Sequence, residues 1–148
     1  MNFGGHLAGG FLTAVVVTAV LYFFGLFENL HWLWGIPLCV LYSLIPDLDH
    51  PNSRIRKYFE IFALCCILLS SYAMSQNYVL LWQGALVSMF FAGMLLFVWT
   101  QRHRGTFHTL FFGYIISLPL MLFEGVYVVY ALLGFITHLI LDKKVRVI

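Results

Sequence analysis

Long stretches almost without charged side chains constrain this chain more than any other feature. Six apolar segments run roughly over residues 7–27, 30–45, 58–75, 78–99, 105–123 and 125–141, and an α-helix needs about 20 such residues to cross a bilayer. Hydrophobic residues make up 62% of the chain and charged residues 9%, against roughly 45–50% and 25% in a soluble domain. We therefore predict an all-α, polytopic helical membrane bundle of about six transmembrane or membrane-embedded helices, forming one integral membrane domain over residues 1–148.

The basic residues orient this predicted bundle. With six spans, the N-terminus, the 46–57 loop, the 100–104 loop and the C-terminus share one side of the membrane. All eight Lys and Arg residues fall on that side: Arg54, Arg56, Lys57, Arg102, Arg104, Lys143, Lys144 and Arg146. Because cytoplasmic loops carry an excess of Lys and Arg, we expect a multi-pass protein of the cell inner (plasma) membrane with both termini in the cytoplasm.

Several classes of function lack their sequence signals. The chain has no glycine-rich phosphate loop and no Gly-x-Ser-x-Gly elbow, and its basic loops are explained by topology, so we expect no nucleic-acid partner. The cysteines Cys39, Cys65 and Cys66 all lie inside apolar runs. We interpret them as small apolar residues and not as metal ligands or a disulfide framework.

The histidines and aspartates gather at the predicted cytoplasmic face. This set holds five of the six histidines and every aspartate: His6, Asp47, Asp49, His50, His103, His108, His138 and Asp142. Ionisable residues near a membrane are costly, so they are usually paired, solvated or functional. The opposite end of the bundle, which is equally wet, has only His31 among these residue types. We predict that the set binds metal, and a purely structural polar layer is the alternative.

The first motif is the segment 46–51, Pro-Asp-Leu-Asp-His-Pro, after the second span. Proline disfavours helical backbone at the residue before it. The carboxylates of Asp47 and Asp49 and the imidazole of His50 can then converge from a stiff turn. The alternative for both aspartates is ordinary turn chemistry.

The second motif is the segment 103–108, His-Arg-Gly-Thr-Phe-His. Five residues of α-helix turn through roughly 500°, so His103 and His108 would not share a helix face. We expect Gly105 to permit a bend, His103 to come from the loop, and His108 to lie in the first helical turn with Thr106 as the N-cap. Arg104 could clamp a phosphate or another oxyanion, or serve only as a topological anchor.

The third motif is the pair of His138 and Asp142, four residues apart near the end of the last span. On a helix these side chains share one face, roughly 6 Å apart along the axis. They could bind one ion together, or Asp142 could orient His138. His6, before the first span, is predicted to be a further ligand, with an interfacial polar role as the alternative.

The number and type of these ligands indicate the metal. Up to eight ligands exceed the four of one tetrahedral ion, so we predict two or three divalent ions. Mixed imidazole and carboxylate ligands suit Zn²⁺, which we expect first, as well as Mn²⁺ or Fe²⁺.

The three motifs together resemble a known family. The segments 44–51 and 103–109 and the pair of His138 and Asp142 resemble the YdjM-like inner-membrane proteins of the LexA-regulated type, which are taken to be metal-dependent hydrolases. The likeness spans nearly the whole chain. That family is in turn distantly similar to zinc-dependent phospholipase C and related single-strand nucleases, helical proteins with a trinuclear zinc site of His and Asp ligands. The resemblance implies phosphoesterase chemistry, and the His138 and Asp142 pair looks like one helical pair of such a site.

These observations lead to a functional prediction. We predict a membrane-embedded hydrolase of phosphoester or phosphoanhydride bonds in a membrane lipid or lipid-linked substrate, because clustered divalent ions activate water and bind phosphoryl oxygens. Asp49 or Asp142 is the predicted metal-bridging residue, and Arg104, with Arg54 as a second candidate, is the residue predicted to hold the phosphate. One alternative is a metal-binding module without catalysis. Another is a metal or proton transporter, which the apolar middles of the spans argue against. The oligomeric state is left open.

Overall fold

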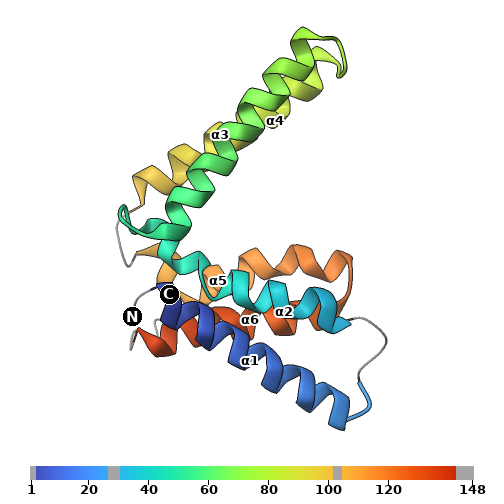
Figure 1. The fold of residues 1–148 in the computed structure, drawn as a ribbon, viewed down its shortest axis with the longest axis vertical. Helices are drawn as coiled ribbons and strands as arrows, with labels where there is room; N and C mark the ends of the chain where they lie inside the picture. The colour runs from blue at the N-terminus through green and yellow to red at the C-terminus, as the bar shows by residue number, and fades with distance from the viewer. Residues whose placement is uncertain (1–2, 27–30, 102–104, 143–148) are drawn as a thin grey trace. The chain divides into compact units, whose positions relative to one another are not determined.

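The computed structural model describes residues 3–26, 31–101 and 105–142, and these residues form helices and connecting turns without a β-strand. The α-helices are α1 (Phe3–Phe23), α2 (His31–Tyr42), α3 (Arg54–Ser75), α4 (Leu81–Thr100), α5 (Leu110–Ser117) and α6 (Gly125–Leu141). Short 3-10 helices are η1 (Ile45–Asp49), η2 (Thr106–His108) and η3 (Leu118–Leu122). The predicted all-α fold is confirmed (Figure 1).

Three of the described helices, α1, α3 and α4, are long and apolar enough to cross a membrane by themselves. The other three are shorter, with 12 residues in α2, 8 in α5 and 17 in α6. Each of the six predicted apolar segments therefore holds a helix. Six is an approximate number of full crossings, because only half of these helices reach the required length.

Prolines end two of the short helices. Pro119 has no backbone N–H to continue the hydrogen-bond ladder, and α5 ends at Ser117, just before it. The predicted segment 105–123 is not one helix but η2, α5 and η3 in succession. Beside this break the Tyr42 hydroxyl donates to the main-chain carbonyl of Ile116 at 2.7 Å. Before Pro46, α2 ends at Tyr42, as the sequence predicted, but the chain continues as the 3-10 helix η1 and not as an extended turn.

The chain forms two compact units, one of residues 1–47 and 104–148 and one of residues 48–103. In the first unit α1, α2 and α6 pack against one another, and α5 packs against α6 (Figure 1). The core between these helices contains fully buried aromatic side chains, among them Tyr130 and Phe135 of α6. Predicted metal ligands of this unit lie at or next to the ends of α1, α2 and α6.

Two glycines let the helices of the first unit approach closely. A Cβ atom added to Gly10 of α1 would lie 2.8 Å from the Cβ of Ser43, and one added to Gly134 of α6 would collide with the carbonyl oxygen of Cys39. Neither position takes a larger residue unless the helices move apart, which is the usual role of small residues between membrane helices.

The second unit contains a hairpin of the two long helices α3 and α4 (Figure 1). The hydroxyls of Ser70 and Ser88 share a hydrogen bond of 2.7 Å between these helices. Glu60 accepts hydrogen bonds from Arg56 Nε at 2.9 Å and from Trp99 Nε1 at 2.8 Å, which joins α3 to α4. Large apolar side chains on both helices are exposed, as expected for surfaces that face lipid.

Candidate metal centre

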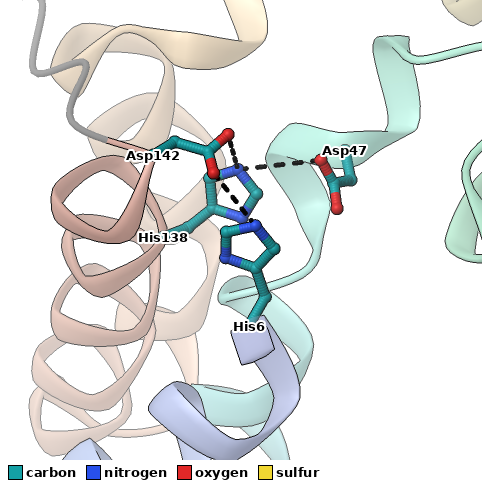
Figure 2. A group of neighbouring side chains, drawn as sticks. All are labelled: His6, Asp47, His138 and Asp142. Carbon is teal, nitrogen blue, oxygen red and sulfur yellow. Dashed lines mark ion pairs between the residues drawn. The ribbon is translucent and has the colours of Figure 1, made fainter. Parts of the chain in front are cut away.

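Four of the predicted ligands come together in the first unit. His6 lies on α1, Asp47 on η1, His138 in the last turn of α6, and Asp142 directly after α6. One ligand atom from each residue lies within 4.8 Å of the others (Figure 2). His6 was predicted to precede the first span, but α1 begins at Phe3, because the helix extends beyond the apolar run that marks it in the sequence.

The carboxylate of Asp142 links the two imidazoles of this group. Its Oδ1 is 3.2 Å from His6 Nε2, and its Oδ2 is 3.6 Å from His138 Nε2. On the other side, Asp47 Oδ1 is 3.8 Å from His138 Nε2 (Figure 2). Two ligand atoms bound to one tetrahedral ion at about 2.1 Å are about 3.4 Å apart. The spacing of these atoms therefore fits a shared cation.

The two imidazoles of this group are fully buried. The rings of His6 and His138 stack with their centroids 3.9 Å apart and their planes at 18°. Three ring nitrogens of this pair have no hydrogen-bond partner among the described residues: Nδ1 and Nε2 of His6 and Nε2 of His138. A buried polar atom without a partner costs roughly 1–3 kcal/mol. A divalent cation would bind these nitrogens and the carboxylate oxygens at once, so the residues present fit such an ion.

A hydrogen bond on the far side of the His138 ring fixes its tautomer. Nδ1 of His138 donates to the main-chain carbonyl of Ser43 at 2.8 Å. Because that acceptor is a carbonyl, the proton is on Nδ1, and Nε2 presents its lone pair to the carboxylates of Asp47 and Asp142. Metal-binding histidines commonly have this type of second contact. The sequence analysis missed Ser43, because a serine at the end of an apolar helix carries no ligand signal.

The carboxylates form the accessible edge of the group. The side chains of Asp47 and Asp142 keep 17% and 11% of their surface exposed, against 0% for His6 and His138. Burial raises the pKa of the Asp142 carboxyl, and hydrogen bonding together with the charges of His138 and His6 lowers it by more, so that its pKa lies below the usual value. Asp142 is therefore ionised near neutral pH, the form that binds a cation.

His108 lies beside this group. Its Nε2 is 3.9 Å from Asp142 Oδ2, its ring centroid is 5.4 Å from that of His138, and its side chain is 1% exposed. The prediction of its local structure was wrong, because His108 ends the 3-10 helix η2 and is not in the first turn of α5. The N-cap of α5 is Thr109, not Thr106, and its hydroxyl accepts from the N–H of Phe112 at 3.1 Å.

The remaining predicted ligands are not part of this group in the first unit. Asp49 and His50 belong to the second unit. Asp49 ends η1 with 1% of its surface exposed, and His50 Nδ1 accepts from the N–H of Asn52 at 3.1 Å. His103 and Arg104 lie outside the described residues. Metal binding by these four residues stays a prediction.

The comparison with protein families gives a match over residues 1–144, to the YdjM inner membrane protein family. The chain belongs to this family. As a YdjM protein it is an integral protein of the inner membrane, in agreement with the three long apolar helices. The resemblance to the YdjM inner membrane proteins, inferred from the motifs, is thereby confirmed. No curated protein and no solved structure matches the chain.

Proposed function

We propose that this YdjM protein is a metal-dependent hydrolase that acts on phosphoester or phosphoanhydride bonds of a lipid or lipid-linked substrate at the cytoplasmic face. The proposal rests on the group of His6, Asp47, His138 and Asp142, whose ligand atoms lie within 4.8 Å of one another. Ionisable groups buried in a membrane protein are costly and mark functional sites. Two imidazoles with two carboxylates are a donor set for Zn²⁺, Mn²⁺ or Fe²⁺.

Each ligand has a role in this proposal. The four grouped residues would hold one ion, and His108 together with Asp142 would hold a second. Asp142 suits both, because its Oδ1 faces His6 while its Oδ2 faces His138 and His108. Bound divalent ions would lower the pKa of water and bind phosphoryl oxygens. A substrate would approach over the half-buried carboxylates and not through the buried imidazoles.

The substrate class follows from the position of the group and from its neighbours in the sequence. The ligands lie at one end of the apolar helices α1 and α6, where a lipid headgroup would meet them. Lys143 and Lys144 follow Asp142 directly, and Arg104 precedes His108 by four residues. Such cations attract a phosphate, and guanidinium binds it through two parallel hydrogen bonds. Arg104 thus remains the proposed phosphate-binding residue, and Asp142 is the predicted metal-bridging residue that belongs to this group.

One observation favours a second candidate function. Four protein ligands are enough to saturate one tetrahedral ion, as they do in structural zinc sites, whereas catalytic sites keep an open position. The group would then be a metal-binding membrane module without catalysis. Transport is less well supported, because transport sites usually lie near the bilayer midplane, while these ligands lie at helix ends.

The metal content of the purified, detergent-solubilised protein tests the proposal first. Inductively coupled plasma mass spectrometry would be applied to the wild type, His138→Ala, His108→Ala and a control, Ser88→Ala, which alters only the α3–α4 hairpin. We expect about two ions per chain in the wild type and the control, and about one in either His108→Ala or His138→Ala, because each variant loses a ligand of a different ion. Lack of stoichiometric metal, even after reconstitution with Zn²⁺ and Mn²⁺, would refute metal binding.

Activity then separates the two candidates. Phosphate or headgroup release from a panel of lipid phosphates is expected from the wild type and Ser88→Ala and is expected to be lost in His138→Ala. A wild type that binds one ion per chain and hydrolyses none of these lipids would favour the module without catalysis.

A further inference from the structure

Ser43 contacts both helices that carry the stacked imidazoles. Its side chain is fully buried at the end of α2. The Ser43 hydroxyl has one proton, which two main-chain carbonyls share: that of His6 at 3.0 Å and that of Val40, in the last turn of α2, at 2.7 Å. The main-chain carbonyl of Ser43 accepts from His138 Nδ1 at 2.8 Å. Ser43, which is not a proposed metal ligand itself, thus contacts the backbone of His6 and the ring of His138.

The packing around Ser43 makes room for these contacts. Gly10 of α1 lies one helical turn after His6, and a Cβ atom at Gly10 would collide with the Ser43 hydroxyl. The thiol of Cys39, one turn before Ser43, is 3.4 Å from the carbonyl of Gly10. The close approach of α1 to α2 is therefore centred on the residues that flank the Ser43 hydroxyl.

We propose that Ser43 is a positioning residue for the metal centre. Its hydroxyl holds the main chain of His6, and its main-chain carbonyl holds His138 in the tautomer with the proton on Nδ1. This inference rests on the proposed metal binding. His6 is the only ligand of the group on α1, so the distance of its imidazole from Asp142 and His138 depends on how α1 docks at this point. Metal–ligand distances tolerate only about 0.2 Å, and loss of a residue that supports a ligand typically lowers metal affinity about 10- to 100-fold.

A matched pair of variants separates positioning from general stability. Ser43→Ala removes a hydroxyl that bonds one carbonyl in its own helix and one group in a neighbouring helix. Thr18→Ala removes a hydroxyl of the same kind, because Thr18 Oγ1 is 2.8 Å from the Ala14 carbonyl and 2.7 Å from the Tyr130 hydroxyl. Thr18 lies twelve residues after His6 on α1, roughly 18 Å along the helix axis. Both variants lose an inter-helix hydrogen bond, which is buried at Ser43 and partly buried at Thr18, and only Ser43→Ala loses it beside the metal centre.

The readouts are the Zn²⁺ dissociation constant, measured by competition with a chromophoric chelator, the absorption spectrum of the Co²⁺-loaded protein, and the thermal unfolding of the metal-free protein. We expect Ser43→Ala to raise the dissociation constant about 10- to 100-fold and to shift the Co²⁺ spectrum. Thr18→Ala should leave the dissociation constant within about threefold and the spectrum unchanged, although both variants lower the unfolding temperature. A dissociation constant for Ser43→Ala that equals that of Thr18→Ala would overturn the inference.

Two further outcomes keep the test decisive. If Ser43→Ala does not fold, Ser43→Cys takes its place, because a thiol keeps the shape with a weaker donor; an affinity equal to that of Thr18→Ala would again overturn the inference. A wild-type protein that binds neither Zn²⁺ nor Co²⁺ would instead refute the proposed function itself.

Discussion

Replacing Gly10 with alanine should weaken metal binding through a displacement of α1. The added Cβ would lie 2.8 Å from the Ser43 Cβ and 3.2 Å from the Val40 Cα, whereas non-bonded carbon atoms prefer about 3.5–4.0 Å. The Val40 Cα is part of the main chain and the Ser43 Cβ is bonded directly to it, so neither atom can move without the backbone. The contact is therefore relieved mainly by moving α1 away from α2, by roughly 1 Å. His6 is one turn away on the same helix and would move by a similar amount.

This displacement translates into a measurable loss of affinity. The Nε2 of His6 is 3.2 Å from Asp142 Oδ1, and a movement of about 1 Å exceeds the roughly 0.2 Å tolerance of a metal–ligand distance. We expect the Zn²⁺ dissociation constant of Gly10→Ala to rise at least about tenfold, or about 1.4 kcal/mol. Overpacking should also destabilise the metal-free protein by about 1–3 kcal/mol.

The assay is Zn²⁺ titration against a competing chelator in detergent micelles, with thermal unfolding measured on the same samples. Gly93→Ala on α4 is the control, because a Cβ at Gly93 meets nothing within 4 Å and alanine favours a helix over glycine by about 0.5–1 kcal/mol. It should bind Zn²⁺ like the wild type and unfold at the same or a slightly higher temperature. If Gly10→Ala behaved like Gly93→Ala in both measurements, the close approach of α1 to α2 would not set the position of His6.

Three other perturbations give distinct expectations. Removal of metal with a chelator should lower the unfolding temperature, and Zn²⁺ at 100 times its dissociation constant should restore about 2.7 kcal/mol of stability; an unchanged unfolding temperature would contradict metal binding. Gly134→Ala drives a Cβ into the carbonyl of Cys39 and should destabilise the protein by about 1–3 kcal/mol in thermal unfolding, so that wild-type stability would argue against this packing. Glu60→Gln weakens the partly exposed link to Arg56 and Trp99 and should cost about 1 kcal/mol or less in thermal unfolding; a loss of more than about 2 kcal/mol would contradict a weak, solvent-screened link.

The helices could be predicted because their signals are local. Apolar runs mark where a chain enters lipid, and each of the six runs holds a helix. The ends of helices were predicted less well. Pro46 lies between an apolar run and charged residues and was recognised as a break, whereas Pro119 lies inside a continuous apolar run and was not. Thr109 was not recognised as the N-cap of α5, because Thr106, closer to Gly105, has the same side chain.

The candidate site could be predicted in its residue types but not in its support. The basic residues gave the topology, and the topology placed His6, Asp47, His138 and Asp142 in one layer. The pair of His138 and Asp142 follows from helical periodicity alone. The role of Ser43 depends on the approach of residue 43 to residues 6 and 138 in space, and no local pattern in the sequence records that approach.

The grouped ligands come from both ends of the chain, and this has a consequence for biogenesis. Helices enter the membrane in the order of synthesis, with N-terminal parts first. When α1 and α2 have been inserted, His6 and Asp47 are present, but His138 and Asp142 of the four-residue group are still to be made. The proposed metal ion, held by all four residues, would therefore be captured only after α6 has packed against α1 and α2. Occupancy of the site would mark the completion of membrane insertion, and newly made chains without α6 would remain metal-free.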